Sequence, residues 1–328
     1  MDTIPTITVC VTAYNQAKYI RQTLDGILAQ KDVDFHIIVA DNCSPDNTIE
    51  ILQKYKANYP DKITIINQPE NLGLVRNLGI CTKAAKSPFI AICEGDDFWI
   101  DDYKLRKQLN LLEADSSCSF SHTAWTDLYE VSGKMVQSPI SHGLYAVESQ
   151  GGKKAVEEIM QEDYRGIRFS SILYRRDIIL QAMNEGILTF NTKYSTMDIA
   201  FFYALAYFGK AAYLPDYTTA YRIQAESISS SSVLDKKIGF SLGCLYIYRD
   251  FILKLQLDKN AIDRTLRRSF QFLYPAALMN KDKKLAQELA RIANECGYKL
   301  RIGQRLCHLG ASVMLLNYTI KRLLRLNL

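Results

Sequence analysis

The chain has 328 residues, of which 48% are hydrophobic and 23% are charged. This length and composition allow one large or two ordinary domains with a buried core, and they exclude disordered and fibrous proteins. The formal net charge of +5 does not predict a nucleic-acid partner, because the surplus of bases lies near the C-terminus and the rest is close to neutral.

The N-terminus does not resemble a secretory signal peptide. Its first five residues include an acid, and the apolar run that follows extends only from Ile7 to Val11. The eight cysteines are scattered without a C-x-x-C pair, which favours buried free thiols in a reducing compartment. Both observations predict a cytoplasmic protein.

Strand-like and helical segments alternate over about the first hundred residues. The expected strands are 6–12, 35–40, 62–66 and 89–93, and the expected helices are 19–30, 44–59 and about 74–86. For the second helix, Ser44 is expected as the N-cap and Pro45 as the first helical residue. The alternation predicts an α/β fold with a doubly wound, mostly parallel sheet and helices on both faces.

Three carboxylates follow the apolar segment 89–93, which by itself fits a buried strand or a piece of buried helix. Glu94, Asp96 and Asp97 would repel one another unless a positive group lies among them, and such oxygen ligands suit Mg2+ or Mn2+. Ligands of doubly wound sheets bind beyond the carboxyl ends of the strands, where Asp41 would also lie. The alternative is that Asp96 and Asp97 cap the following helix. These residues alone leave both interpretations open.

Two common nucleotide-binding motifs are absent from the sequence. No G-x-G-x-x-G follows the first strand, and no G-x-x-x-x-G-K-[ST] occurs anywhere. This argues against dinucleotide-binding and P-loop proteins.

Four segments occur in an order typical of the family 2 glycosyltransferases with the GT-A fold, and the chain resembles this family. They are Val9–Asn15, Val39–Asn42 with Ser44, Asn71–Asn77 and Glu94–Asp97. The resemblance is strong over about residues 5–115 and looser over 115–230. It implies inverting transfer from a nucleotide-sugar donor, usually a uridine diphosphate sugar.

The resemblance also implies roles for residues of these segments. The implied donor-binding residues are Thr12, Ala13, Tyr14, Asn15, Asp41, Asn42, Asn71, Gly73, Arg76 and Asp96. Asp96 and Asp97 match the D-x-D element of the family and would hold the ribose and a metal ion, Mg2+ or Mn2+. Glu94 is a departure, because many members have Asp at this position.

The segment from about 102 to 230 contains the expected acceptor side. The predicted elements are a helix over 102–113, a strand over 118–127, a hairpin turn at 132–133 and a later strand over 169–176. His122 and Trp125 are candidates for contact with the acceptor, and a structural role is the alternative for His122. The resemblance adds Tyr221 and Arg222 to this side, and Gln224 replaces a His that is often found after that pair.

Asp198 lies in the first turn of a nearly all-apolar helix. A helix dipole favours an acid at this position, so a capping role is one interpretation. The resemblance implies instead that Asp198 is the general base of the reaction.

Beyond residue 232 the sequence predicts helices near 234–254, 260–279, 282–295 and 304–326. The residues after Cys296 include no acid and these bases: Lys299, Arg301, Arg305, Lys321, Arg322 and Arg325. The last helix has too few apolar residues to span a membrane. Its leucines and bases predict peripheral contact with the anionic inner face of a membrane, docking on a partner or a second copy of the chain, or packing on the rest of the chain.

Together these patterns predict a catalytic domain over 1–232, with donor binding in about 1–115 and the acceptor side and base in about 116–232, and a helical region over 233–328. The predicted enzyme is a metal-dependent inverting hexosyl- or N-acetylhexosaminyltransferase. Its acceptor would be a hydroxyl of a saccharide, free or lipid-linked, in surface polysaccharide or glycan assembly. The alternatives are a sugar-nucleotide nucleotidyltransferase, which should open with a glycine-rich phosphate loop, and a non-catalytic scaffold subunit that binds nucleotide sugars.

Overall fold

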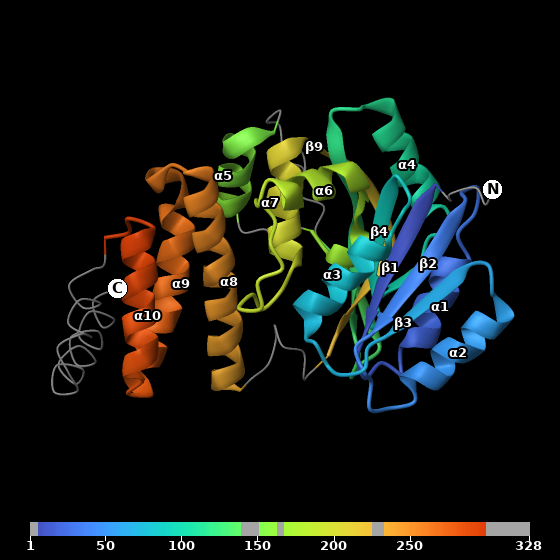
Figure 1. The fold of residues 1–328 in the computed structure, drawn as a ribbon, viewed down its shortest axis with the longest axis horizontal. Coiled ribbons are helices and arrows are strands. Elements are labelled where there is room, and N and C mark those ends of the chain that lie inside the picture. The colour runs from blue at the N-terminus through green and yellow to red at the C-terminus, as the bar shows by residue number, and fades with distance from the viewer. Residues whose placement is uncertain (1–5, 139–150, 163–166, 225–232, 300–328) are drawn as a thin grey trace.

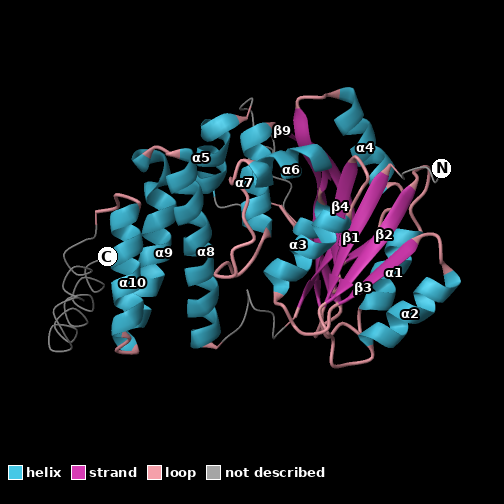
Figure 2. Cartoon of the chain, in the orientation of Figure 1, coloured by secondary structure: helices cyan, strands magenta, loops and turns pink. Residues whose placement is uncertain are grey.

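The computed structural model of the chain describes residues 6–138, 151–162, 167–224 and 233–299. A curled sheet with helices on its faces forms one half of the molecule, and a stack of helices forms the other (Figures 1 and 2). Helix α7 (Asp198–Phe208) lies between these two halves. The α/β fold predicted from the sequence is therefore confirmed.

The first four strands form the parallel half of the sheet. Strand β1 (Ile7–Ala13) pairs in parallel with β2 (Phe35–Asp41) on one side and with β4 (Phe89–Glu94) on the other. Strand β3 (Ile63–Asn67) extends the parallel pairing beyond β2. The register places Ala13 opposite Asp41 and Thr12 opposite Glu94, so the carboxyl ends of β1, β2 and β4 meet at one edge.

The second helix begins later than the sequence predicts. The three helices of this half are α1 (Ile20–Leu28), α2 (Thr48–Asn58) and α3 (Leu74–Ala84). The N-cap of α2 is Asn47, so Ser44 and Pro45 lie in the preceding loop. Ser44 donates from its N and its Oγ to the carboxylate of Asp41, over 3.0 and 2.5 Å. The expected cap is wrong because Ser44 closes a turn with Asp41 instead.

The later strands make the other half of the sheet mixed. They are β5 (Phe98–Trp99), β6 (Cys118–Tyr129), β7 (Lys134–Gln137), β8 (Leu173–Arg175) and β9 (Lys210–Ile223). In the described residues the strand order is β3-β2-β1-β4-β8-β6-β9-β5, and β7 pairs with β6 outside this path. The hairpin between β6 and β7 is confirmed. The expected strand over 169–176 is shorter than predicted, because Phe169–Ser171 form a 3-10 turn, η1, before β8.

Two buried apolar clusters cover the two faces of the parallel strands, because side chains alternate along a strand. On one face Val9 packs with Leu24 of α1 and with Leu109 of α4 (Lys104–Ala114). On the other face Cys10 belongs to a larger cluster that includes Phe201 of α7. This larger cluster also takes in α5 (Gly152–Glu162) and α6 (Arg176–Asn184).

Three long helices follow the sheet, as the sequence predicts. They are α8 (Leu234–Leu255), α9 (Lys259–Met279) and α10 (Lys283–Glu295). Tyr203 of α7 packs edge-on against Phe251 of α8, with ring centroids 5.3 Å apart, so the larger cluster continues into these helices. The fourth predicted helix, 304–326, lies outside the described residues. Within the described ranges, the search for a helix long and apolar enough to cross a membrane finds none.

The cysteines confirm the expected free thiols as far as the structure describes them. Every cysteine in the described ranges is free, and all of these except Cys43 are buried. Cys307 lies outside these ranges.

Candidate functional site

Hydrogen bonds join the chain segments that follow β1, β2 and β4. Gly95 N donates to Thr12 O over 3.0 Å, and Asn42 N donates to Ala13 O over 2.9 Å. A Cβ atom on Gly95 would lie 2.8 Å from Thr12 O, so this approach requires glycine. The structure thus brings predicted donor-binding residues of three strands to one edge of the sheet.

Asn42 and Asn71 connect the end of β2 with the turn before α3. Asn42 Nδ2 donates to Asn71 Oδ1 over 2.8 Å, and Asn42 Oδ1 accepts from Leu72 N over 2.8 Å. Asn71 Oδ1 also accepts from Gly73 N over 2.9 Å, and the φ of +81° at Gly73 favours glycine. The two amides therefore shape the turn that leads to Arg76.

Exposure divides the predicted donor-binding residues into two groups. Tyr14, Asn15 and Arg76 are exposed, so their side chains are available to a ligand. Thr12 and Asp41 are buried, and Asp41 is 1% exposed. Asp41 accepts from N and Oγ of Ser44, so its side chain holds the loop after β2.

The three carboxylates at the end of β4, those of Glu94, Asp96 and Asp97, all have raised pKa values. Burial is the largest cause of the raised pKa of each, and the pKa of Asp97 is raised to about 7 by burial and the charge of Asp96 together. The charge of Asp96 adds to the rise for Asp97, and the charges of Asp97 and Asp96 add to the rise for Glu94. Negative groups arranged in this way favour a cation among them.

Asp97 faces inward. Its Oδ1 accepts from Arg222 N over 3.0 Å and its Oδ2 accepts from Ser170 Oγ over 2.7 Å. Ser170 Oγ accepts in turn from Glu94 N over 3.0 Å. Asp97 thus joins β4, η1 and β9 and is 1% exposed, and its predicted role as a metal ligand stays a prediction. Glu94 and Asp96 are the partly exposed carboxylates of the cluster.

Asp198 starts α7 and is partly exposed. Its Oδ1 accepts from Thr196 Oγ1 over 2.6 Å and from Ile199 N over 2.7 Å. Both of these hydrogen bonds are made by Oδ1. Burial raises the pKa of Asp198, and the two hydrogen bonds oppose this rise. Asp198 also contributes to the raised pKa of Glu94, so the carboxylates of a strand end and a helix start lie within electrostatic range.

Arg168 is the residue of this site that the sequence analysis missed. Its guanidinium lies 4.0 Å from the ring centroid of Tyr221 and 5.0 Å from that of Trp125, and its Nη2 lies 3.6 Å from Asp127 Oδ1. The Arg168 charge opposes the raised pKa of Glu94, Asp97 and Asp198.

Arg168 Nε is buried and has no hydrogen-bond partner among the described residues. The residue precedes η1 in a segment without a motif, so the only sequence signal was its charge.

The acceptor-side candidates occupy different environments. His122 is completely buried, with its ring 4.9 Å from that of Tyr213, so packing accounts for it and the predicted acceptor contact is not supported. Trp125 is 5% exposed and donates from Nε1 to Asp127 Oδ1 over 2.9 Å. Trp125 and Tyr221 both contact the Arg168 guanidinium, and their place on the acceptor side stays a prediction.

Arg222 lies beside the carboxylate cluster. It donates from Nε to Asp96 O over 2.9 Å, and Gln224 Nε2 donates to Asp96 Oδ2 over 2.9 Å. The Arg222 guanidinium stacks on the ring of Tyr19, 4.5 Å from its centroid. These contacts fix Asp96 from the β9 side.

The carboxylate oxygens of this site fit a hard divalent cation that the protein binds together with substrate. Glu94 and Asp96 offer carboxylate oxygens, which suit Mg2+ or Mn2+. Within the described residues no three Asp, Glu, His or Cys side chains form a ready metal cage. Mg2+ commonly binds one or two carboxylates together with substrate phosphates, and this arrangement matches the pair found here.

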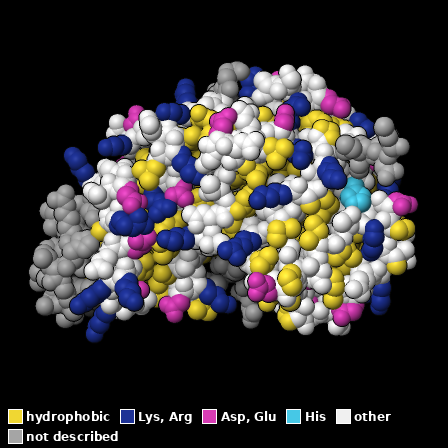
Figure 3. Space-filling model, viewed as in Figure 1, with side chains coloured by type: hydrophobic (Ala, Val, Ile, Leu, Met, Phe, Trp, Pro, Cys, Tyr) yellow, Lys and Arg dark blue, Asp and Glu magenta, His cyan; other side chains and the backbone are white. Residues whose placement is uncertain are grey.

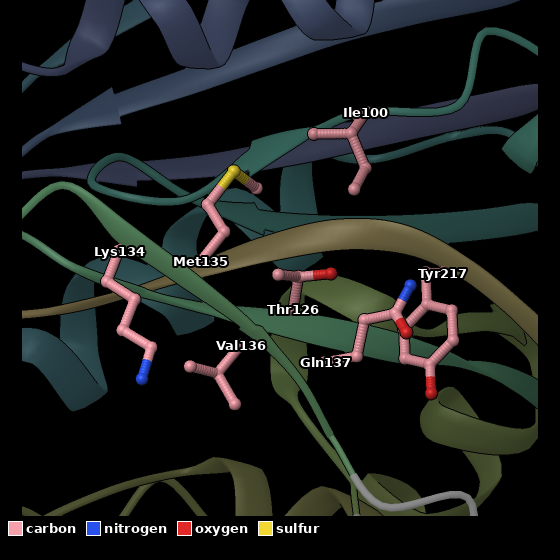
Figure 4. A pocket seen from close by; sticks show the side chains of 7 residues that line it. All are labelled: Ile100, Thr126, Lys134, Met135, Val136, Gln137 and Tyr217. Carbon is pink, nitrogen blue, oxygen red and sulfur yellow. The ribbon is translucent and has the colours of Figure 1, made fainter.

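A separate hollow of about 770 Å3 lies beside β7. Figure 4 shows Met135, Ile100, Thr126 and Tyr217 around it. Its lining includes none of the carboxylates described above. Thr126 points to the opposite face of β6 from Trp125 and Asp127, because side chains alternate along a strand.

Charges of both signs are interspersed over α8 to α10 on the face drawn in Figure 3. Arg291, for example, lies 2.6 Å from Glu288. Apart from Lys299, the bases of the predicted cationic tail lie outside the described residues.

Comparison with known sequences gives a family and several relatives. Residues 8–179 match the family described as Glycosyl transferase family 2. An uncharacterized protein of Mycobacterium tuberculosis is 28% identical over 226 residues, which are 69% of this chain and 61% of that protein. This chain therefore spans about three fifths of that relative. The putative teichuronic acid biosynthesis glycosyltransferase TuaG of Bacillus subtilis is 27% identical over 267 residues, 80% of this chain and 98% of TuaG.

Comparison with solved structures agrees on the fold. The structure of S. aureus TarS 1-349 in complex with UDP-GlcNAc has a TM-score of 0.63 and 17% identity, over 94% of this chain and 89% of that one. The mannosyltransferase PcManGT from Pyrobaculum calidifontis, in complex with GDP-Man and Mn2+, has a TM-score of 0.54 and 16% identity, over 98% of this chain and 88% of that one. At these identities the likeness concerns the fold, which is the GT-A fold that the sequence resemblance implies.

Proposed function

This chain belongs to glycosyl transferase family 2, and we propose that it transfers one sugar from a nucleoside diphosphate donor to a hydroxyl of a saccharide acceptor, with inversion. The observation that carries the proposal is the proximity of Asp198, at the start of α7, to Glu94, at the end of β4. A base close to a cation-binding carboxylate suits direct displacement at a sugar carbon. The donor is a uridine diphosphate sugar in this proposal, as for the TarS complexes.

The donor occupies the edge formed by β1, β2 and β4. Tyr14, Asn15 and Arg76 contact the nucleotide with their exposed side chains. Asp41 and Asn42 act by holding the loops around it, because their polar atoms already bind the protein. Nucleotides bind at this edge because the strand ends of a doubly wound sheet leave a crevice there.

Asp96 and Glu94 would hold the divalent cation, Mg2+ or Mn2+, which would supply positive charge to neutralise the departing diphosphate. The complex of PcManGT with GDP-Man and Mn2+ supports the choice of ion. Asp97 positions this pair from within, through Ser170 and the backbone of Arg222.

Asp198 is the general base. Oδ1 is engaged by Thr196 and Ile199, which leaves Oδ2 to accept the proton of the acceptor hydroxyl. As that proton moves to Asp198, the hydroxyl oxygen bonds to the anomeric carbon and the bond from that carbon to the diphosphate oxygen breaks. Arg168 keeps Asp198 more acidic than burial alone would, and so preserves the ionised base.

The test is incubation of the protein with a panel of nucleotide sugars and Mn2+. Slow hydrolysis of one donor supports the transferase, and an Asp198→Asn variant should bind that donor and fail to turn it over. Pyrophosphate-dependent release of a nucleoside triphosphate would establish a nucleotidyltransferase instead. Absence of any reaction with every donor would leave a scaffold subunit.

The acceptor in this proposal is a saccharide, free or lipid-linked, in surface polysaccharide assembly, which agrees with the printed name of TuaG. The catalytic domain would extend over 1–232 and the helical region over 233–328. The bases after Cys296 would place the protein at the cytoplasmic face of a membrane, because each base near an anionic surface contributes about 1 kcal/mol. Co-sedimentation with anionic vesicles, for the full chain and for a chain ending before Lys299, tests this placement.

A further inference from the structure

Helix α8 approaches the segment before the general base very closely at one point. A Cβ atom on Gly243 would lie 1.8 Å from Ser195 Oγ and 2.5 Å from Ser195 N. A rotation of the serine side chain would relieve the first clash but not the second, which involves backbone. Gly243 is therefore in direct contact with the main chain three residues before Asp198, and it is buried there.

Polar contacts hold the same segment to α8. Ser195 Oγ donates to Gly239 O over 3.0 Å. Tyr194 OH donates to Asp250 Oδ2 over 2.7 Å, and Asp250 is itself held by Arg249 Nε over 2.8 Å. The segment is thus fixed along several turns of α8, from Gly239 to Asp250.

The segment leads directly to the base. Thr196 follows Ser195, and its Oγ1 orients Asp198 through Oδ1 over 2.6 Å. On the α8 side, burial and then the Asp198 charge raise the pKa of the Cys244 thiol to about 12, so Asp198 is also electrostatically close to the residue after Gly243. A shift of Ser195 would therefore pass through Thr196 to the reacting carboxylate.

We propose that Gly243 is a positioning residue of the catalytic site: its missing side chain lets α8 hold Ser195 and Thr196 where they orient Asp198. The inference rests on the proposed role of Asp198 as base. It means that α8, in the C-terminal helical region, helps to position the active site. The residues proposed to contact the nucleotide follow β1 (Tyr14 and Asn15) or lie on α3 (Arg76), so the role of Gly243 concerns turnover and not donor affinity.

The test compares Gly243→Ala with Gly239→Ala. Both changes add one methyl group to α8, but a Cβ atom on Gly239 would meet nothing within 4 Å and the carbonyl that binds Ser195 is kept. The assay is hydrolysis of the nucleotide sugar that the wild type turns over, with Mn2+ present and water in place of the acceptor. Binding of UDP with Mn2+ is measured by calorimetry in parallel.

Gly243→Ala is expected to lower kcat roughly 10- to 100-fold, because small displacements of a catalytic group have effects of this size. The KM for the donor and the UDP affinity should stay at wild-type values, and Gly239→Ala should keep the wild-type kcat. Adding Ser195→Gly to Gly243→Ala removes the clashes of the new methyl group with Ser195 Oγ and with Ser195 Cβ, which would be 2.6 Å away, and should recover part of the lost kcat. Wild-type kcat in Gly243→Ala would overturn the proposal.

A second variant covers the case in which Gly243→Ala does not fold. Tyr194→Phe keeps the ring and removes the hydroxyl that binds Asp250. It should lower kcat without changing UDP affinity, and unchanged kcat in this variant would also overturn the proposal. A wild type that turns over no donor would instead refute the proposed function, so the two failures are distinguishable.

Discussion

Replacing Asp96 by asparagine is expected to stabilise the ligand-free protein and to weaken its binding of a nucleotide with a divalent cation. The charge of Asp96 contributes to the raised pKa of Asp97 and of Glu94. Asparagine keeps the size of the side chain and an oxygen that can accept from Gln224. The substitution therefore removes repulsion with little change of shape.

The magnitude follows from the pKa of Asp97. A rise from the ordinary 3.8 to about 7 corresponds to roughly 4 kcal/mol against the ionised form. Burial is the largest cause and the charge of Asp96 is the second, so we expect Asp96→Asn to add roughly 1 to 2 kcal/mol to the free energy of unfolding.

The effect has a defined pH dependence. Because the folded-state pKa of Asp97 is raised, its contribution to stability is complete below about pH 4 and is lost as the pH rises through about 7. The advantage of Asp96→Asn should therefore be small at pH 4 and complete at pH 8.

Urea unfolding at pH 4 and pH 8, with chelator present, measures the stability of wild type and variant. Asp34→Asn, at an exposed position, is the matched control and should change stability little. Thermal unfolding with UDP and Mn2+ then measures binding, and the increase in Tm should be smaller for Asp96→Asn than for wild type. The reasoning fails if Asp96→Asn is no more stable than wild type at pH 8, or if the ligands stabilise both proteins equally.

Three further changes test other parts of the structure. Arg168→Gln should raise the pKa of Asp198 and move the acidic limb of the pH profile of kcat/KM to higher pH. Arg168→Lys should keep more of the wild-type profile, and coincident profiles of Arg168→Gln and wild type would contradict this. Lys104 is buried and its pKa is lowered to about 7, so its contribution to stability is complete above about pH 10 and is lost as the pH falls through 7. Lys104→Met should accordingly be more stable than wild type at pH 6, by up to roughly 4 kcal/mol, and lose this advantage by pH 10 in denaturant titrations. Gly95→Ala should lower the free energy of unfolding by roughly 1 to 3 kcal/mol, because its Cβ would press on Thr12 O, and an unchanged denaturation midpoint would disprove the close approach.

The sequence by itself determined the parallel half of the sheet. Alternating apolar runs and helical stripes predicted β1 to β4 with α1 to α3, because the buried face of each element shows in the spacing of its own apolar residues. The carboxylates at the end of β4 and the acid at the start of α7 were also visible, since the former end an apolar run and Asp198 precedes one. The resemblance to glycosyltransferases depended on these local patterns and agreed with the family match.

Only the tertiary structure decided which way these side chains face and what surrounds them. Asp97 turns inward because Ser170 and the Arg222 backbone, 73 and 125 residues further along the chain, supply its hydrogen bonds. Arg168 reaches the carboxylates because Tyr221 and Trp125 support its guanidinium, and no local pattern records such stacking. The contact of Gly243 with Ser195 is of the same kind, because a close approach between distant segments depends on packing and leaves no periodicity in either sequence.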